Sequence, residues 1–219
     1  MQVSQIQTLL SSWLDDPNQS YFLPAQTLVW INNAQRQVQL QLIQAGQNFY
    51  EKPVETTLVI NQSDYMLPSD FIELHRLEVV ISGTAPNENR SPITEVTTNQ
   101  QDLVALSTGT PVHYLIKKDR FTLFPCPDQA LTLRLYYSPM VTDLANSTDV
   151  PDVPEEYMEY VCLLAAFNGF IKDDRAPQNL MAKKAEYETL LKQMAVDRTT
   201  DRSRQVVEVG GYGIGDWVY

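Results

Sequence analysis

The sequence is short of positive charge. It contains 16 Lys and Arg residues against 27 Asp and Glu residues, which gives a net charge of −11 at pH 7. A protein that binds DNA or RNA through the phosphates needs clustered basic side chains to neutralise them. The composition therefore argues against a protein that wraps nucleic acid with a basic face.

Long apolar runs are missing as well. The longest covers residues 161–167, whereas a membrane-spanning helix needs about 20 residues. The first residues do not combine a charged region with an apolar one, so we expect no secretory signal there. Hydrophobic residues still make up 43% of the 219 residues, which is enough for a packed core and excludes a chain disordered throughout.

Cysteine is scarce, because Cys126 and Cys162 are the only two. A single disulfide is one alternative, but a chain with a core of this size does not need one, and we expect reduced thiols in a protein made in the cytoplasm. His75 and His113 complete the set of soft or borderline metal ligands, and no pair among the four has the close spacing of a zinc site. We predict no metal site and no cofactor.

Catalytic motifs are weak or absent. The sequence has no Gly-x-Ser-x-Gly elbow, and the glycine run at 210–215 lacks the Lys-Ser/Thr of a phosphate loop. Glu155, Glu156 and Glu159 could be arranged as the carboxylate pair of a glycosidase. Acids in the first turn of a helix also stabilise it by about 0.3–1 kcal/mol each, which is the simpler explanation. We predict a protein that is not an enzyme, with a carboxylate-dependent hydrolase as the alternative.

The N-terminal zone, residues 1–52, has helical periodicity. A short helix is expected to end near Asp15-Asp16-Pro17, and a longer one to run from Pro24, which suits a first turn, to Gly46, which suits a stop. Apolar residues of the longer helix recur at spacings of three and four and mark its core-facing side. They are Leu28, Ile31, Ala34, Val38, Leu42 and Ala45.

The other faces of the longer helix are rich in amides and poor in charge. Such a face is typical of a polar contact with another protein, and equally of a neutral surface in water. We take it as the candidate subunit interface. The residues concerned are Asn33, Arg36, Gln37, Gln41 and Gln44.

Residues 53–150 change to strand-like patterns rich in β-branched and aromatic residues. In the run 131–137 three leucines alternate with Thr132 and Arg134, as in a half-buried antiparallel strand. The segment Lys117-Lys-Asp-Arg120 predicts a hairpin, and residues 99–106 a short helix. The predicted strands are 57–60, 72–81, 112–117, 120–124 and 131–137.

Residues 151–198 return to helix. Asp152 is a candidate N-cap ahead of an early proline and two acids, and the helix should stop near residues 172–175. A second helix restarts after Pro177, so the two form a helical hairpin. Residues 199–219 lose the helical period and are predicted to form an extended C-terminal arm, whose apolar residues need a partner surface. The candidate docking residues are Tyr212, Ile214, Trp217, Val218 and Tyr219.

The predicted fold class is therefore α+β: a small helical bundle with an inserted antiparallel β-domain and an extended C-terminal arm. Four motifs follow one another along the chain: Asp64-Tyr-Met-Leu-Pro-Ser-Asp-Phe71, Gly109-Thr-Pro-Val-His-Tyr114, Leu123-Phe-Pro-Cys-Pro-Asp128 and Asp152-Val-Pro-Glu-Glu-Tyr-Met-Glu-Tyr-Val161. Their order resembles that of the head-to-tail adaptor (connector) proteins of tailed bacteriophages, especially short-tailed ones, over residues 22–198.

The resemblance implies a structural protein of the virion neck, between capsid and tail, made in the cytoplasm of the bacterial host. Its implied partners are the portal protein, a tail or nozzle protein and further copies of itself in a ring, usually of twelve. Double-stranded DNA passes through without specific binding, for which an acidic lumen is suitable. No membrane is involved. Two further alternatives are another neck or tail-tube ring component and a soluble peptide-binding module.

Overall fold

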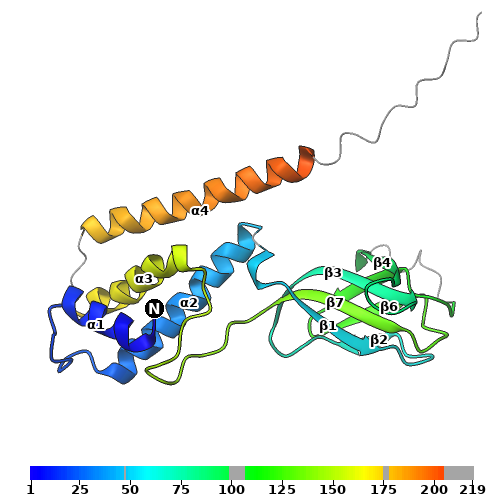
Figure 1. Cartoon of the computed structure of the whole chain (residues 1–219), viewed down its shortest axis with the longest axis horizontal. Helices are drawn as coiled ribbons and strands as arrows, with labels where there is room; N and C mark the ends of the chain where they lie inside the picture. Colours follow the sequence, from blue (N-terminus) through cyan, green and yellow to red (C-terminus); the bar gives the residue numbers. More distant parts are fainter. Residues whose placement is uncertain (47, 99–106, 175–177, 205–219) are drawn as a thin grey trace, which may run out of the picture. The chain divides into compact units, whose positions relative to one another are not determined.

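The structure is a computed structural model that describes residues 1–46, 48–98, 107–174 and 178–204 (Figure 1). These residues belong to two compact units, Met1–Gln47 with Val141–Tyr219, and Asn48–Met140. The first unit contains the α-helices and the second contains one mixed sheet. The predicted α+β class is therefore confirmed.

The helical unit contains α1 (Val3–Trp13), α2 (Pro24–Gln44), α3 (Met158–Lys172) and α4 (Gln178–Arg204). The sequence determines the ends of α2 as predicted. Pro24 occupies the first turn, and Gly46, just beyond the helix end, has a φ of +71°, a conformation that glycine adopts without strain. The apolar side of α2 is buried at five of its six predicted positions, and Leu28 is half-buried.

Helix α3 packs against α1, α2 and α4. Its predicted core residues Val161, Leu164 and Ala165 are all buried. Close packing also depends on Gly169, because a Cβ atom there would lie 2.7 Å from both methyl groups of Leu14. The missing side chain therefore permits α3 to approach the end of α1.

Two details of the predicted helices are corrected. Pro154, and not Asp152, is the N-cap of the 3-10 turn η3 (Glu155–Tyr157) that precedes α3. Helix α4 continues to Arg204, so residues 199–204, predicted as part of the arm, are helical. The short helix predicted at 99–106 and the five candidate docking residues of the arm lie outside the described residues.

The sheet unit begins with the 3-10 turn η1 (Asn48–Tyr50) and contains seven strands in the order β1-β7-β3-β4-β5-β6-β2. The predicted all-antiparallel arrangement is wrong at one pair, because β4 runs parallel to β5. Residues 96–112 connect these two strands, and a connection of that length permits a parallel crossover where a tight hairpin would not. The strands are β1 (Lys52–Thr57), β2 (Asp64–Met66), β3 (Phe71–Ser82), β4 (Asn89–Glu95), β5 (His113–Lys117), β6 (Arg120–Phe124) and β7 (Thr132–Pro139).

The strand prediction fails at the two edge strands, β1 and β2, and at β4 in the middle of the sheet. The run 57–60 is not a strand, because β1 ends at Thr57, opposite the first residue of β7, Thr132. Strands β2 and β4 were missed, since β2 has three residues and β4 contains Pro92. The predicted β5–β6 hairpin is confirmed, with Lys117 opposite Arg120.

One face of the sheet forms the core of this unit. Leu133 and Leu135 of β7, which lies between β1 and β3, are opposite Val79 and Leu77 of β3, and all four are buried. The alternation predicted for β7 therefore holds on this face. The same core contains Leu58, Tyr65, Ile93, Tyr114, Phe121, Leu123 and Tyr137.

Candidate interaction surfaces

Polar side chains of α2 bind the backbone of residues 141–144. The Gln35 Nε2 donates to the Thr142 carbonyl at 3.0 Å, and the Val141 N–H donates to Gln39 Oε1 at 3.0 Å. The Asn32 amide both donates to and accepts from the backbone of Leu144. Part of the polar side of α2 thus satisfies hydrogen bonds within this chain.

The five predicted interface residues divide into two groups. Arg36 forms an ion pair with Asp143, and Gln41 is half-buried with its Oε1 atom covered. Asn33, Gln37 and Gln44 are exposed. The structure therefore brings three of the five residues to the same open side of α2.

Two apolar residues share this open side and were missed by sequence reasoning. Val29 is 54% exposed and Leu40 is 45% exposed. Residues 29, 33, 37, 40 and 44 follow one another in steps of four, four, three and four, which places them on one side of a helix. This spacing is the sequence signal that could have identified Val29 and Leu40. We call these five residues the α2 stripe.

Helix α4 is held to α3 mainly through polar and aromatic contacts. The Glu159 carboxylate accepts hydrogen bonds from Lys183 Nζ and, at 2.9 Å, from the Tyr187 hydroxyl. The ring of Tyr187 stacks on that of Tyr160 with centroids 5.1 Å apart. The bond from Lys183 lowers the pKa of Glu159, and burial, with Glu159 nearby, raises the pKa of Tyr187 to about 12.

The environments of the candidate hydrolase carboxylates differ from those that a glycosidase requires. Glu155 and Glu156 are exposed in the 3-10 turn before α3. A glycosidase general acid requires a raised pKa, whereas that of Glu159 is lowered. The observed partners of Glu159 give it a role in joining α3 to α4.

The four candidate metal ligands have other neighbours. His75 Nε2 lies 2.7 Å from the Ser138 hydroxyl, and His113 Nδ1 lies 2.7 Å from the Thr94 hydroxyl. Both cysteines are free thiols, and Cys162 is buried in α3, which raises its pKa to about 11. Within the described ranges, no three His, Cys, Asp or Glu residues converge as metal ligands would.

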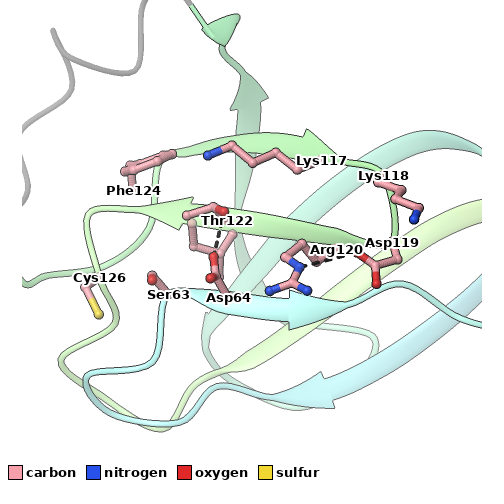
Figure 2. Close-up of a pocket in the computed structure, with 10 residues that line it drawn as sticks. Ser63, Asp64, Lys117, Lys118, Asp119, Arg120, Thr122, Phe124 and Cys126 are labelled. Carbon is pink, nitrogen blue, oxygen red and sulfur yellow. Dashed lines mark hydrogen bonds and ion pairs between the residues drawn. The ribbon is translucent and has the colours of Figure 1, made fainter.

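A charged hollow of about 560 Å³ lies beside the β5–β6 hairpin (Figure 2). Its two carboxylates already have partners, because Asp64 accepts from the Thr122 hydroxyl at 2.6 Å and Asp119 pairs with Arg120 at 3.3 Å. The Arg120 bond lowers the pKa of Asp119. The hollow is completed by Ser63, Lys117, Lys118, Leu123, Phe124 and Cys126. The Asp64 bond joins β2 to β6, and the Asp119 pair lies within the turn of the hairpin.

A network of ion pairs lies on the other face of the sheet, across β1, β7 and β3. Arg134 on β7 lies between Glu55 of β1 and Glu78 of β3 and also donates to Glu88 at 3.0 Å. Sequence alternation placed Arg134 on this face correctly, but its side chain is only 10% exposed. The hydrogen bonds to Glu88 and Glu55 raise the pKa of Arg134, and Arg134 lowers that of Glu88. The network fixes three neighbouring strands and the loop that carries Glu88.

Comparison with known proteins gives the class. No helix in the described part of the chain is long and apolar enough to cross a bilayer. A search of curated proteins finds no match, but a protein-family model, that of the SU10 adaptor protein, matches residues 1–209. The class is that of the bacteriophage adaptor proteins, as the motif order predicted. The chain belongs to the SU10 adaptor protein family.

Proposed function

We propose that the chain is the head-to-tail adaptor of a short-tailed bacteriophage. Copies of it form a ring, of twelve subunits, beneath the portal protein in the virion neck, extend the DNA channel and dock the tail or nozzle protein. The observation that carries this proposal is the family match over residues 1–209. The role is structural, and double-stranded DNA passes through without specific binding.

The charge of the chain supports a channel role. With 27 acidic against 16 basic side chains, the ring as a whole repels a polyanion, so a duplex inside it does not form a network of ion pairs. DNA therefore slides during ejection. The division into residues 1–52, 53–150, 151–198 and 199–219 belongs to the same proposal, with the β-rich segment inserted between the helical segments.

Two sets of residues are assigned to assembly. Asn33, Gln37 and Gln44, supplemented by the neighbouring Arg36 and Gln41, form the subunit interface on α2. The docking residues on the portal or on the adjacent subunit are Tyr212, Ile214, Trp217, Val218 and Tyr219. Tyrosine and tryptophan contribute large contact areas with few rotatable bonds, which suits an anchor.

The direct test is to mix the purified protein with portal rings of the same phage and to examine the complexes by electron microscopy. We expect a second ring stacked coaxially on the portal. A protein that stays monomeric with the portal, as a soluble peptide-binding module would, contradicts the proposal. A ring that assembles only on tail tubes would assign the chain to the tail instead.

The hydrolase alternative requires a separate test. Purified protein incubated with bacterial cell walls should release no more soluble sugar or peptide than a Glu155→Gln/Glu159→Gln variant does. Release by the wild-type protein that the double variant lacks would establish catalysis and overturn the structural role.

A further inference from the structure

A ring needs two different surfaces on each subunit, because a head-to-tail contact pairs one patch with another. The α2 stripe is one candidate surface. It consists of Val29, Asn33, Gln37, Leu40 and Gln44, all exposed, with no charged member. Residues on the other side of α2, such as Ile31 and Val38, are fully buried against the helical unit.

A second uncharged stripe lies on α4. Its members are Gln178, Ala182, Ala185, Thr189 and Gln193, all exposed and spaced by four, three, four and four residues. We call these five residues the α4 stripe. The opposite side of α4 faces α3, since Leu191 is buried and Tyr187 stacks on Tyr160. The α4 stripe is therefore about half a helical turn away from α3.

The two stripes belong to different surfaces of the helical unit. Both helices pack on α3, and each stripe faces away from its own buried side. Helix α3 meets α4 through Glu159, Tyr160 and Phe167, whereas its close approach to α2 is at Gly169, beside Trp30. This arrangement satisfies the requirement of a head-to-tail contact.

The stripes match each other in length and in their lack of charge. Residues 29–44 and 178–193 each span about 22 Å of helix at about 1.5 Å per residue. Neither stripe contains a charged residue, although the whole chain has a net charge of −11. The two stripes therefore do not repel each other electrostatically. If the two helices run antiparallel with Gln37 opposite Ala185, Leu40 lies opposite the small side chain of Ala182, which is the size relation that helix packing uses.

We infer that neighbouring copies contact each other by packing the α2 stripe of one subunit against the α4 stripe of the next. This inference rests on the proposed ring, and it names the surface that α2 meets. A stripe paired with itself would place Val29 and Leu40 against the same side chains and would form a closed two-fold dimer instead of a ring.

The contact is small. A helix about 10 Å wide and about 22 Å long covers roughly 220 Å², well below the about 800 Å² per partner of a standard stable interface. Two free copies therefore do not associate through it alone. Copies held side by side on a portal ring have a high effective concentration, and there the contact forms.

Introducing like or opposite charges into the two stripes tests the inference. Gln37 and Ala185 stand at the centres of their stripes, so they come close whether the helices run parallel or antiparallel. In about 0.1 M salt, where the screening length is about 10 Å, we expect the Gln37→Glu/Ala185→Glu variant to form about ten-fold fewer rings on portals than wild type. The Gln37→Glu/Ala185→Lys variant should restore them.

Matched controls separate the possible outcomes. A Ser4→Glu/Thr8→Glu variant adds the same charge at exposed positions of α1 and should assemble like wild type, and all variants should melt alike. If both stripe variants assemble equally on portals that accept the wild type, the inference is wrong and the proposed function stands. Restoration by mixing Gln37→Lys with Gln37→Glu protein would pair α2 with α2 and also overturn it. If the wild type forms no ring, the proposed function itself fails.

Discussion

Asp16 directs the chain between α1 and α2. Asp15 before it has a φ of +57°, and the Asp16 carboxylate accepts backbone N–H groups of Ser20, Tyr21 and Phe22 at 2.8–3.0 Å. The bond from Phe22 is the main reason that the pKa of Asp16 falls from 3.8 to about 2. Three donors that a tight connection would leave unpaired are thereby satisfied.

Replacing Asp16 by Asn should lower the stability of the helical unit in a pH-dependent way. A depressed pKa means that the carboxylate stabilises the fold above its unfolded-state pKa of 3.8, and that this contribution is lost as the pH falls towards about 2. Urea unfolding should therefore separate wild type from Asp16→Asn at pH 7 and bring them together near pH 2. Asp15→Asn, at an exposed neighbour, should match wild type throughout. A gap that persists at pH 2 would show that the ionised carboxylate is not the cause.

Gln39 is a buried glutamine on α2, a helix that also carries glutamines on its exposed side. It is 1% exposed, and its Oε1 accepts the N–H of Val141. Gln39→Leu would leave that buried N–H without its acceptor and should cost about 1–3 kcal/mol of unfolding free energy. Gln37→Leu, on the exposed side of α2, should change it by less than about 0.5 kcal/mol. Equal effects in chemical denaturation would contradict the assigned role of Gln39.

At the scale of elements, α3 is the central helix of its unit. Its buried residues contact helices that precede it by more than a hundred residues and one that follows it. The position of Gly169, near the end of α3, sets how closely the helix can approach Leu14 and Trp30, whose atoms lie 2.7 and 3.2 Å from a Cβ built there.

Gly169→Ala tests this close approach. Alanine in a helix is favoured over glycine by about 1 kcal/mol, but forcing a methyl group into a packed site costs about 1–3 kcal/mol. We expect a net loss of stability of up to about 2 kcal/mol in thermal or urea unfolding. Combining it with Leu14→Ala should cost less than the sum of the two single changes, because the second change removes the clash. A more stable Gly169→Ala variant would disprove the tight contact.

At the scale of the whole molecule, assembly is assigned to surfaces that the single chain leaves open. Residues 205–219 lie beyond the described part of α4, and their Tyr, Trp and Ile residues carry the proposed docking role. If they act on a partner, removing them should affect binding and leave the fold alone.

Deletion of residues 206–219 separates docking from folding. We expect portal binding to be lost, measured by co-sedimentation, while the melting temperature stays unchanged. If these residues instead fold back on their own β-domain, the melting temperature should fall. Full portal affinity of the truncated protein would show that the docking energy comes from elsewhere.

The sequence by itself determined those features that depend only on residues within one helix or strand. Pro24 and Gly46 delimit α2, the apolar period marks its buried side, and the alternation in residues 131–137 orients β7. These features depend on backbone preferences and on spacing within one element, which a sequence contains in full. The motif order likewise led to the adaptor family.

Tertiary structure alone decided which polar residues are available. Gln35 and Gln39 are buried because residues 141–144 lie against α2, while Gln37 and Gln44 remain exposed on the same helix. The parallel pairing of β4 with β5 and the burial of Arg134 among three glutamates also depend on partners distant in sequence. The sequence does not distinguish a glutamine that binds a segment of the same chain from one that stays exposed. Composition therefore identified α2 as an interface candidate, and packing decided which of its amide side chains remain exposed.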